Sequence, residues 1–129
     1  MVIDTSALLA ILRDEPESDA LINAIANHPD PIISAATLVE ARIVVEARLG
    51  PGGTDRLNQL LEAGGVRVVA FDGAQSLTAH RAWRDFGRGN SPARLNLGDC
   101  YSYSLAKETG RPLLFKGDDF SKTDIDPAA

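Results

Sequence analysis

The sequence predicts an α/β domain built around a mostly parallel sheet of four or five strands. Short apolar runs rich in β-branched residues alternate with longer segments of helical periodicity, and parallel neighbours need such crossover helices. No stretch rich in Gly, Pro or Ser divides the 129 residues, and this length suits one hydrophobic core. We therefore expect residues 1–129 to form a single domain.

The first half of the chain alternates between apolar runs and helical patterns. The polar run Asp4-Thr5-Ser6 splits VI from LLAIL, so a very short buried strand should lead directly into a capped helix. Pro29 and Pro31 end the next helical pattern, and Gly50 to Gly53 interrupt a long one. The expected elements are a strand at 2–3, the helix after it, a helix at 17–27, a strand beginning at Ile32, and a helical hairpin of 36–49 and 54–63.

The second half repeats the alternation. Residues 66–71 are rich in β-branched side chains, which is typical of a strand. Gly110 ends a helical pattern, and residues 87–97 are irregular and carry arginines. The expected elements are a strand at 66–71, a helix at 74–86, a loop at 87–97, a helix at 99–109, a strand at 112–116 and a short edge strand near 123–125.

Composition excludes several classes of protein. The apolar fraction of 44% and charged fraction of 24% argue against disorder and against membrane insertion. No apolar run reaches a membrane span, and Asp4 falls too early for a signal peptide, so we expect a cytoplasmic protein with no membrane partner. The single cysteine, Cys100, cannot form an intramolecular disulfide, and we expect it in the core.

Four acidic positions are candidates for chemistry. Ligands of open parallel sheets bind beyond the carboxyl ends of the strands, and Asp4 and the pair Asp118-Asp119 follow predicted strands. Asp99 begins a predicted helix. Helix capping explains Asp4 or Asp99 taken alone, and a solvated turn explains the adjacent acids. Their expected convergence at one end of one sheet favours a functional site.

Glu40 is the fourth candidate. Positions 36, 40, 43, 44 and 47 share one face of the predicted helix, and every residue there except Glu40 is apolar. If that face is buried, the carboxylate needs a cation, a proton or an opening to a cleft. Clustered carboxylates are the ligands that Mg²⁺ and Mn²⁺ prefer, and such ions activate water for phosphodiester hydrolysis.

These residues resemble those of the PIN-domain family, specifically the VapC toxins. The resemblance spans essentially the whole chain and rests on VIDTSALLAIL, SAATLVEA and GRGNSPARLNLGDCYSYSLAKETGRPLLFKGDDFSKTDI, of which the last is the most specific. It implies a three-layer α/β/α sandwich. It also implies that Asp4, Glu40, Asp99 and Asp119 are the catalytic, metal-binding acids, with Asp118 as a substitute for Asp119, and that Thr5 and Ser6 lie beside the metal.

The resemblance also implies an activity and partners. The expected activity is that of a Mg²⁺- or Mn²⁺-dependent endoribonuclease toxin that cuts structured RNA such as tRNA or rRNA. The expected partners are a VapB-type antitoxin and a second copy of the chain. The net charge of −5 is unusual for a protein that binds RNA, but residues 81–94 hold four arginines against one aspartate. Of these Arg88 and Arg94, in the loop, are the candidates for RNA contact, and simple solvation is the alternative interpretation.

Three other functions fit less well. A phosphoacceptor receiver domain needs paired acids after its first strand, where Asp4 stands alone, although Lys116 would suit that class. A haloacid-dehalogenase-type phosphatase needs a second aspartate where Ser6 stands. A PIN-like binding module without catalysis is the remaining alternative, and its expected sign, a missing acid, is not found.

Overall fold

The computed structural model describes all residues, 1–129, and its sheet is fully parallel. Strands β1 (Val2–Ile3), β2 (Ile32–Ser34), β3 (Arg67–Val69) and β4 (Leu113–Leu114) lie in the order β3-β2-β1-β4. Val2 is in register with Ile32 on one side and with Leu113 on the other. The predicted α/β class and parallel sheet are confirmed, with four strands.

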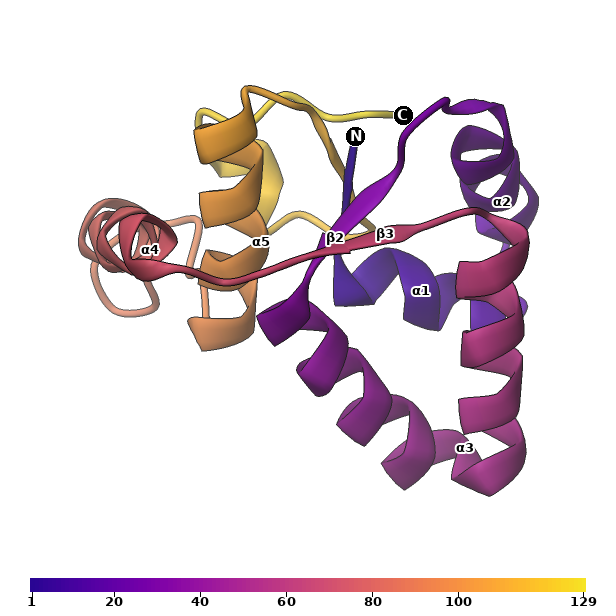
Figure 1. Cartoon of the computed structure of the whole chain (residues 1–129). Helices are drawn as coiled ribbons and strands as arrows, with labels where there is room; N and C mark the ends of the chain where they lie inside the picture. The colour runs from indigo at the N-terminus through magenta and orange to yellow at the C-terminus, as the bar shows by residue number, and fades with distance from the viewer.

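Five helices connect the strands (Figure 1). They are α1 (Thr5–Leu12), α2 (Ser18–Asn27), α3 (Ala35–Ala63), α4 (Gly73–Phe86) and α5 (Leu97–Thr109), followed by a short 3₁₀ helix, η1 (Phe120–Lys122). The predicted hairpin at 36–63 is confirmed: α3 consists of two helical arms that meet at a non-helical residue, Gly50. Gly50 bends it, with φ of 71° and ψ of −171°, a conformation that side chains disfavour.

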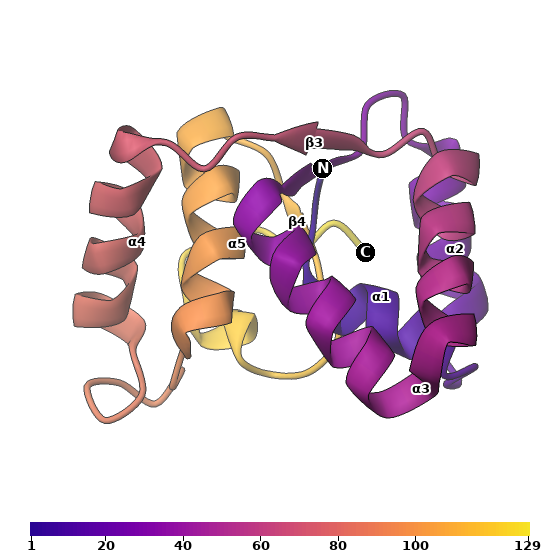
Figure 2. The same ribbon diagram turned by 60° about the horizontal axis from the view of Figure 1, so that its bottom comes forward.

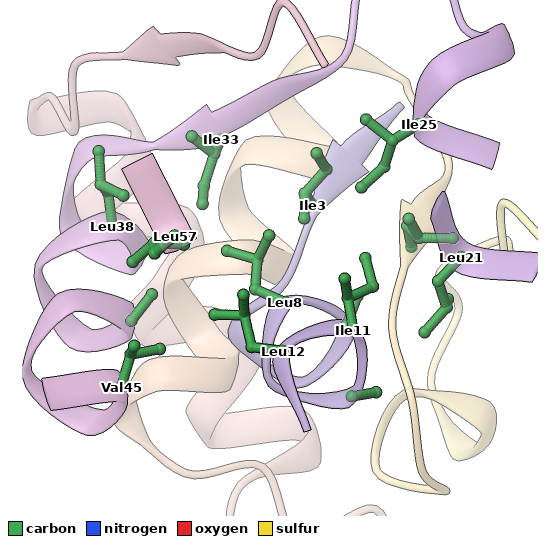
Figure 3. Packing of buried hydrophobic residues seen from close by; sticks show 14 of the residues in the cluster. Ile3, Leu8, Ile11, Leu12, Leu21, Ile25, Ile33, Leu38, Val45 and Leu57 are labelled. Atoms are coloured by element: carbon green, nitrogen blue, oxygen red, sulfur yellow. The ribbon is translucent and has the colours of Figure 1, made fainter. Parts of the chain in front are cut away.

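Successive side chains of each strand point to opposite faces of the sheet, and a hydrophobic core packs against each face. Ile3 and Ile33 point toward α1, α2 and α3, where they pack in the larger cluster (Figure 3), to which Leu114 also belongs. Val2, Ile32 and Leu113 point toward the opposite face, where they pack with residues of α4 and α5. Figure 2 shows α4 lying along the outer side of α5. The layers are those of the expected α/β/α sandwich.

The expected edge strand at 123–125 is wrong. The chain forms η1 just before it, and the C-terminal segment meets the sheet later, where Leu113 pairs with Pro127 in a single parallel bridge. Leu113 N–H donates to the Asp126 carbonyl, and Ala128 N–H donates to the Leu113 carbonyl. These bonds use the residues on either side of Pro127, so a proline, which has no N–H to donate, is tolerated at this edge of the sheet.

Two smaller expectations have clear outcomes. Cys100 is buried in the core, as predicted. None of the helices combines the length and the apolar character that crossing a membrane requires.

Candidate metal centre

The four predicted acids lie at the carboxyl end of the sheet. Helices α1, α3 and α5 all begin at the lower end of the sheet in Figure 1. Asp4 stands between β1 and α1, Glu40 lies in the second turn of α3, and Asp99 is the third residue of α5. Asp118 and Asp119 follow β4 and precede η1. The topology thus brings together residues that are up to 115 positions apart in the sequence.

Asp4 is a buried carboxylate that also caps α1. Its side chain is 3% exposed, and its Oδ2 accepts hydrogen bonds from Ser6 N–H (3.0 Å) and Ser6 Oγ (2.7 Å). Its Oδ1 accepts a bond of 2.5 Å from Ser102 Oγ. Burial raises the pKa of Asp4, whereas these hydrogen bonds lower it. The capping role and the clustering with other acids therefore coexist at this residue.

Asp99 links the four acids electrostatically. It forms a capping box with Asn96, in which Asn96 N–H donates to Asp99 Oδ2 (3.0 Å) and Asp99 N–H donates to Asn96 Oδ1 (2.8 Å). Burial is the largest cause that raises the pKa of Asp99, and the charges of Asp4, Asp119 and Glu40 add to it against the lowering by the bond from Asn96, so that the pKa lies at about 7. Asp119 is the one of the two adjacent acids whose charge acts on Asp99, and it lines a cavity together with Asn96.

Glu40 reaches this cluster, but the sequence argument that singled it out used the wrong face of the helix. The buried face of α3 carries Thr37, Leu38, Ala41 and Val45. The face with Glu40 is open, and Ile43 on it is 63% exposed. Glu40 itself is half-buried, and its Oε1 accepts a hydrogen bond of 2.7 Å from Thr5 Oγ1.

Hydroxyl groups surround the cluster. Thr5 and Ser6 were expected beside the metal. The Thr5 hydroxyl donates a hydrogen bond to Glu40, and the Ser6 hydroxyl donates one to Asp4. Ser6 Oγ also accepts a hydrogen bond from Lys116 N–H (3.0 Å). Ser102 was missed by the sequence analysis. It is fully buried, and its hydroxyl lies 3.2 Å from Thr37 Oγ1 as well as bonding to Asp4. Its position three residues after Asp99, on the same face of α5, was the available signal.

No basic side chain forms an ion pair with these acids. All the ion pairs of the protein lie elsewhere, and Lys116 Nζ pairs with Glu15 and Glu17. As the side chains stand, no three of them have the spacing of a preformed metal site. Mutual repulsion between carboxylates opposes such an arrangement until a cation is present. The donor set, four carboxylates and several hydroxyls, fits Mg²⁺ or Mn²⁺ by its chemistry.

Arg88 and Arg94 border the cluster. With Asn96 and Asp119 they line a polar cavity of about 320 Å³. Their loop is closed at its base, because Arg88 N–H donates to the Leu95 carbonyl and Leu95 N–H donates to the Phe86 carbonyl. Leu95 is fully buried and anchors the loop in the core. The structure thus places both arginines next to an acid of the cluster.

An exposed apolar surface lies on the other side of Glu40. Val39 and Ile43 of α3 and Leu97 of α5 are 59%, 63% and 70% exposed. They line a shallow cavity of about 500 Å³ together with Ala36, Glu40, Val44, Gly98 and Tyr101. We call this the α3/α5 surface. Isolated exposed apolar residues are ordinary, but a contiguous group is typical of an interface.

Comparison with known proteins agrees with this architecture. A family model described as PIN domain matches residues 1–126. The chain is 48% identical over 125 residues to a protein named Ribonuclease VapC from Mycolicibacterium smegmatis, covering 97% of each. It is 46% identical over 129 residues to Ribonuclease VapC42 of Mycobacterium tuberculosis, covering 99% of this chain and 98% of the relative.

Two solved structures share the fold. One is Mycobacterium tuberculosis VapC20, described as a sarcin-ricin loop cleaving toxin, with a TM-score of 0.76 and 17% identity over 96% of this chain and 95% of that one. The other is a toxin-antitoxin complex from Klebsiella pneumoniae, with a TM-score of 0.72 and 15% sequence identity. The match covers 95% of this chain and 92% of the chain in that complex. The family match and the full-length relatives together show that this chain belongs to the PIN-domain family of VapC ribonucleases.

Proposed function

We propose that residues 1–129 form one PIN domain that acts as the ribonuclease toxin of a toxin-antitoxin pair, hydrolysing phosphodiester bonds in RNA. The observation that carries this proposal is the group of four acids at the carboxyl end of the sheet, none of which forms an ion pair with a basic side chain. Near-full-length relatives named as ribonucleases support it. Structured RNA such as tRNA or rRNA is the proposed substrate class, and the cytoplasm, where such RNA is found, is the proposed compartment.

The proposed metal is Mg²⁺ or Mn²⁺. Asp4, Asp99 and Asp119 would hold it, with Glu40 at the edge of the site. When bound, such an ion supplies a Lewis acid that lowers the pKa of water and stabilises negative charge on phosphate oxygens. No side-chain nucleophile is then needed.

The protein's own residues position the reacting groups. Ser102 and Ser6 fix the Asp4 carboxylate by donating to both of its oxygens. Asn96 fixes Asp99 at the first turn of α5, and Thr5 orients Glu40. Arg88 and Arg94, which line the cavity beside Asp119, would bind RNA phosphates and so offset the unfavourable net charge.

Two protein partners are proposed. The solved toxin-antitoxin complex with this fold supports an antitoxin, which we expect to be of the VapB type. A second copy of the chain is expected on the α3/α5 surface. Val45 of α3 is fully buried and cannot contribute to such an interface, whereas Val39 and Ile43 are exposed and are the better candidates.

The alternative, a PIN-like binding module without catalysis, is less well supported. Burying acids beside one another without a cation destabilises a fold, and Asp4 and Asp99 are both buried. A module that only binds nucleic acid or protein gains nothing from this destabilisation of the fold. Replacement of one acid during evolution would relieve the destabilisation. All four acids are present.

Cleavage of a purified small-RNA pool tests the function. Antitoxin-free protein is incubated with Mg²⁺ or Mn²⁺, with EDTA, and as the Asp4→Asn and Asp99→Asn variants. We expect cuts at discrete positions that disappear in EDTA and in both variants. Intact RNA under every condition, with folded protein, would favour the binding module.

A further inference from the structure

Gly98, the second residue of α5, lies directly against the carboxylate of Glu40. It is buried. A Cβ atom added at Gly98 would lie 1.7 Å from Glu40 Oε2, 2.5 Å from Glu40 Cδ and 2.7 Å from Glu40 Oε1. The carboxyl group of Glu40 thus fills the space that any side chain at position 98 would occupy.

The backbone of Gly98 gives no other reason for glycine. Its φ lies outside the positive range that favours glycine, unlike that of Gly50, Gly65 or Gly110. Alanine forms helices better than glycine, so a glycine inside the first turn of α5 weakens the helix. The requirement at this position is therefore space and not backbone freedom.

The three atoms nearest to the added Cβ all belong to Glu40. At Gly87, by contrast, the Cβ would meet the carbonyl of Trp83, which cannot move without disturbing α4. The Glu40 carboxyl group is the far end of a half-exposed, flexible side chain, so a Cβ at position 98 would displace it while leaving the core packed.

Glu40 is held from its other side by Thr5, whose hydroxyl donates to Oε1. Thr5 follows Asp4 and Gly98 precedes Asp99, so the two groups that confine Glu40 adjoin two other acids of the cluster. We propose that Gly98 is a positioning residue of this site, whose missing side chain leaves the room in which the Glu40 carboxylate joins the acid cluster. This inference rests on the proposed metal-dependent activity and adds a residue to it.

The Gly98→Ala variant tests the proposal, with Gly73→Ala as its matched control. Gly73 is the first residue of α4, and a Cβ there meets nothing within 4 Å. We expect Gly98→Ala to fold with an unchanged or higher Tm. Its Mn²⁺ affinity, measured by calorimetry without RNA, and its kcat should fall by roughly 10-fold or more, while KM for RNA is unchanged. Gly73→Ala should match the original protein.

A double-mutant cycle separates positioning from a general effect on α5. In a Glu40→Ala background there is no carboxylate to displace, so Gly98→Ala should cause no further loss of Mn²⁺ affinity. Undiminished Mn²⁺ affinity in Gly98→Ala, or a loss of equal size in both backgrounds, would overturn the proposal.

A crystal structure of Gly98→Ala keeps this inference distinct from the ribonuclease activity. We expect the Thr5–Glu40 hydrogen bond to be broken in that structure, whether or not the protein cuts RNA. If the bond persists, the inference is wrong. If it is broken and the unmodified protein cuts no RNA, the proposed function fails and the positioning of Glu40 by Gly98 stands.

Discussion

The hydroxyl of Ser102 donates a hydrogen bond of 2.5 Å to Oδ1 of Asp4, which joins the second turn of α5 to the end of β1. Both residues are buried, and 98 positions separate them in the sequence. The same hydroxyl lies 3.2 Å from Thr37 Oγ1 of α3. Ser102 of α5 therefore contacts both α3 and the end of β1, next to the acid cluster.

Replacing Ser102 with alanine should weaken both the fold and the site. Asp4 loses one of its donors, and because that bond lowers its pKa, the pKa of Asp4 should rise further. We expect a loss of about 1–2 kcal/mol in the free energy of unfolding at neutral pH, measured by urea denaturation. The pH at which cleavage reaches half its maximum should move upward.

Ser104→Ala is the control for this prediction, because Ser104 is equally buried but donates to the Tyr101 carbonyl within α5. An equal effect of Ser104→Ala on stability and on the pH profile would contradict this role of Ser102.

Replacing Asp99 with asparagine should abolish cleavage and stabilise the metal-free protein. The folded pKa of Asp99, about 7, is above that of an unfolded aspartate, about 3.9. The charged form is thus disfavoured by folding, and stability is lost as the pH rises from about 4 to about 7. In EDTA at pH 7.5 we expect Asp99→Asn to raise Tm by roughly 5 °C. The gain should vanish at pH 4, and an equal gain at both pH values would rule out relief of charge repulsion as its cause.

Arg88 and Arg94 should contribute to RNA binding through phosphates. Each alanine substitution should weaken RNA affinity across sequences and reduce the slope of log affinity against log salt by about 0.7 to 1. Binding is measured with the inactive Asp4→Asn protein at several salt concentrations. Arg81→Ala is the control, because Arg81 is an exposed residue of α4 outside the polar cavity. If all three variants have the same slope as their parent, the two arginines do not contact phosphates.

The α3/α5 surface should mediate dimer formation. Ile43→Glu places a charge at its centre and should convert a dimer into a folded monomer in sedimentation experiments. Leu77→Glu is the matched control, since Leu77 of α4 is 65% exposed and lies outside this surface. A dimer that persists in Ile43→Glu would assign the interface elsewhere.

The sequence predicted the parallel sheet and its helices because each rests on a local pattern, and it predicted acids at the carboxyl end of the sheet because Asp4 and Asp119 follow strands. Glu40 was predicted correctly as a member of the group only through the family resemblance, since the argument from its helix face was wrong.

The sequence could not decide which face of α3 is buried, since Leu38, Ala41 and Val45 on one side and Val39 and Ile43 on the other are all apolar or small. Helical periodicity identifies faces, but the neighbouring elements determine which of them is covered.

Two residues of the site, Ser102 and Gly98, could not be identified from residue type, and only the helical spacing of Ser102 from Asp99 pointed to one of them. A serine in a helix and a glycine near a helix start have many ordinary explanations. Their importance follows from contacts with Asp4 and Glu40, which lie on distant segments of the chain. Only the folded arrangement reveals such contacts.

The most direct test of the acid cluster is a crystal structure of the protein with Mn²⁺, in which anomalous scattering locates the ion. The account predicts one or two peaks bounded by oxygens of Asp4, Asp99 and Asp119, with Glu40 beside them and Asp118 turned away. Peaks confined to other parts of the molecule, or no peak at Mn²⁺ concentrations that support RNA cleavage, would contradict it.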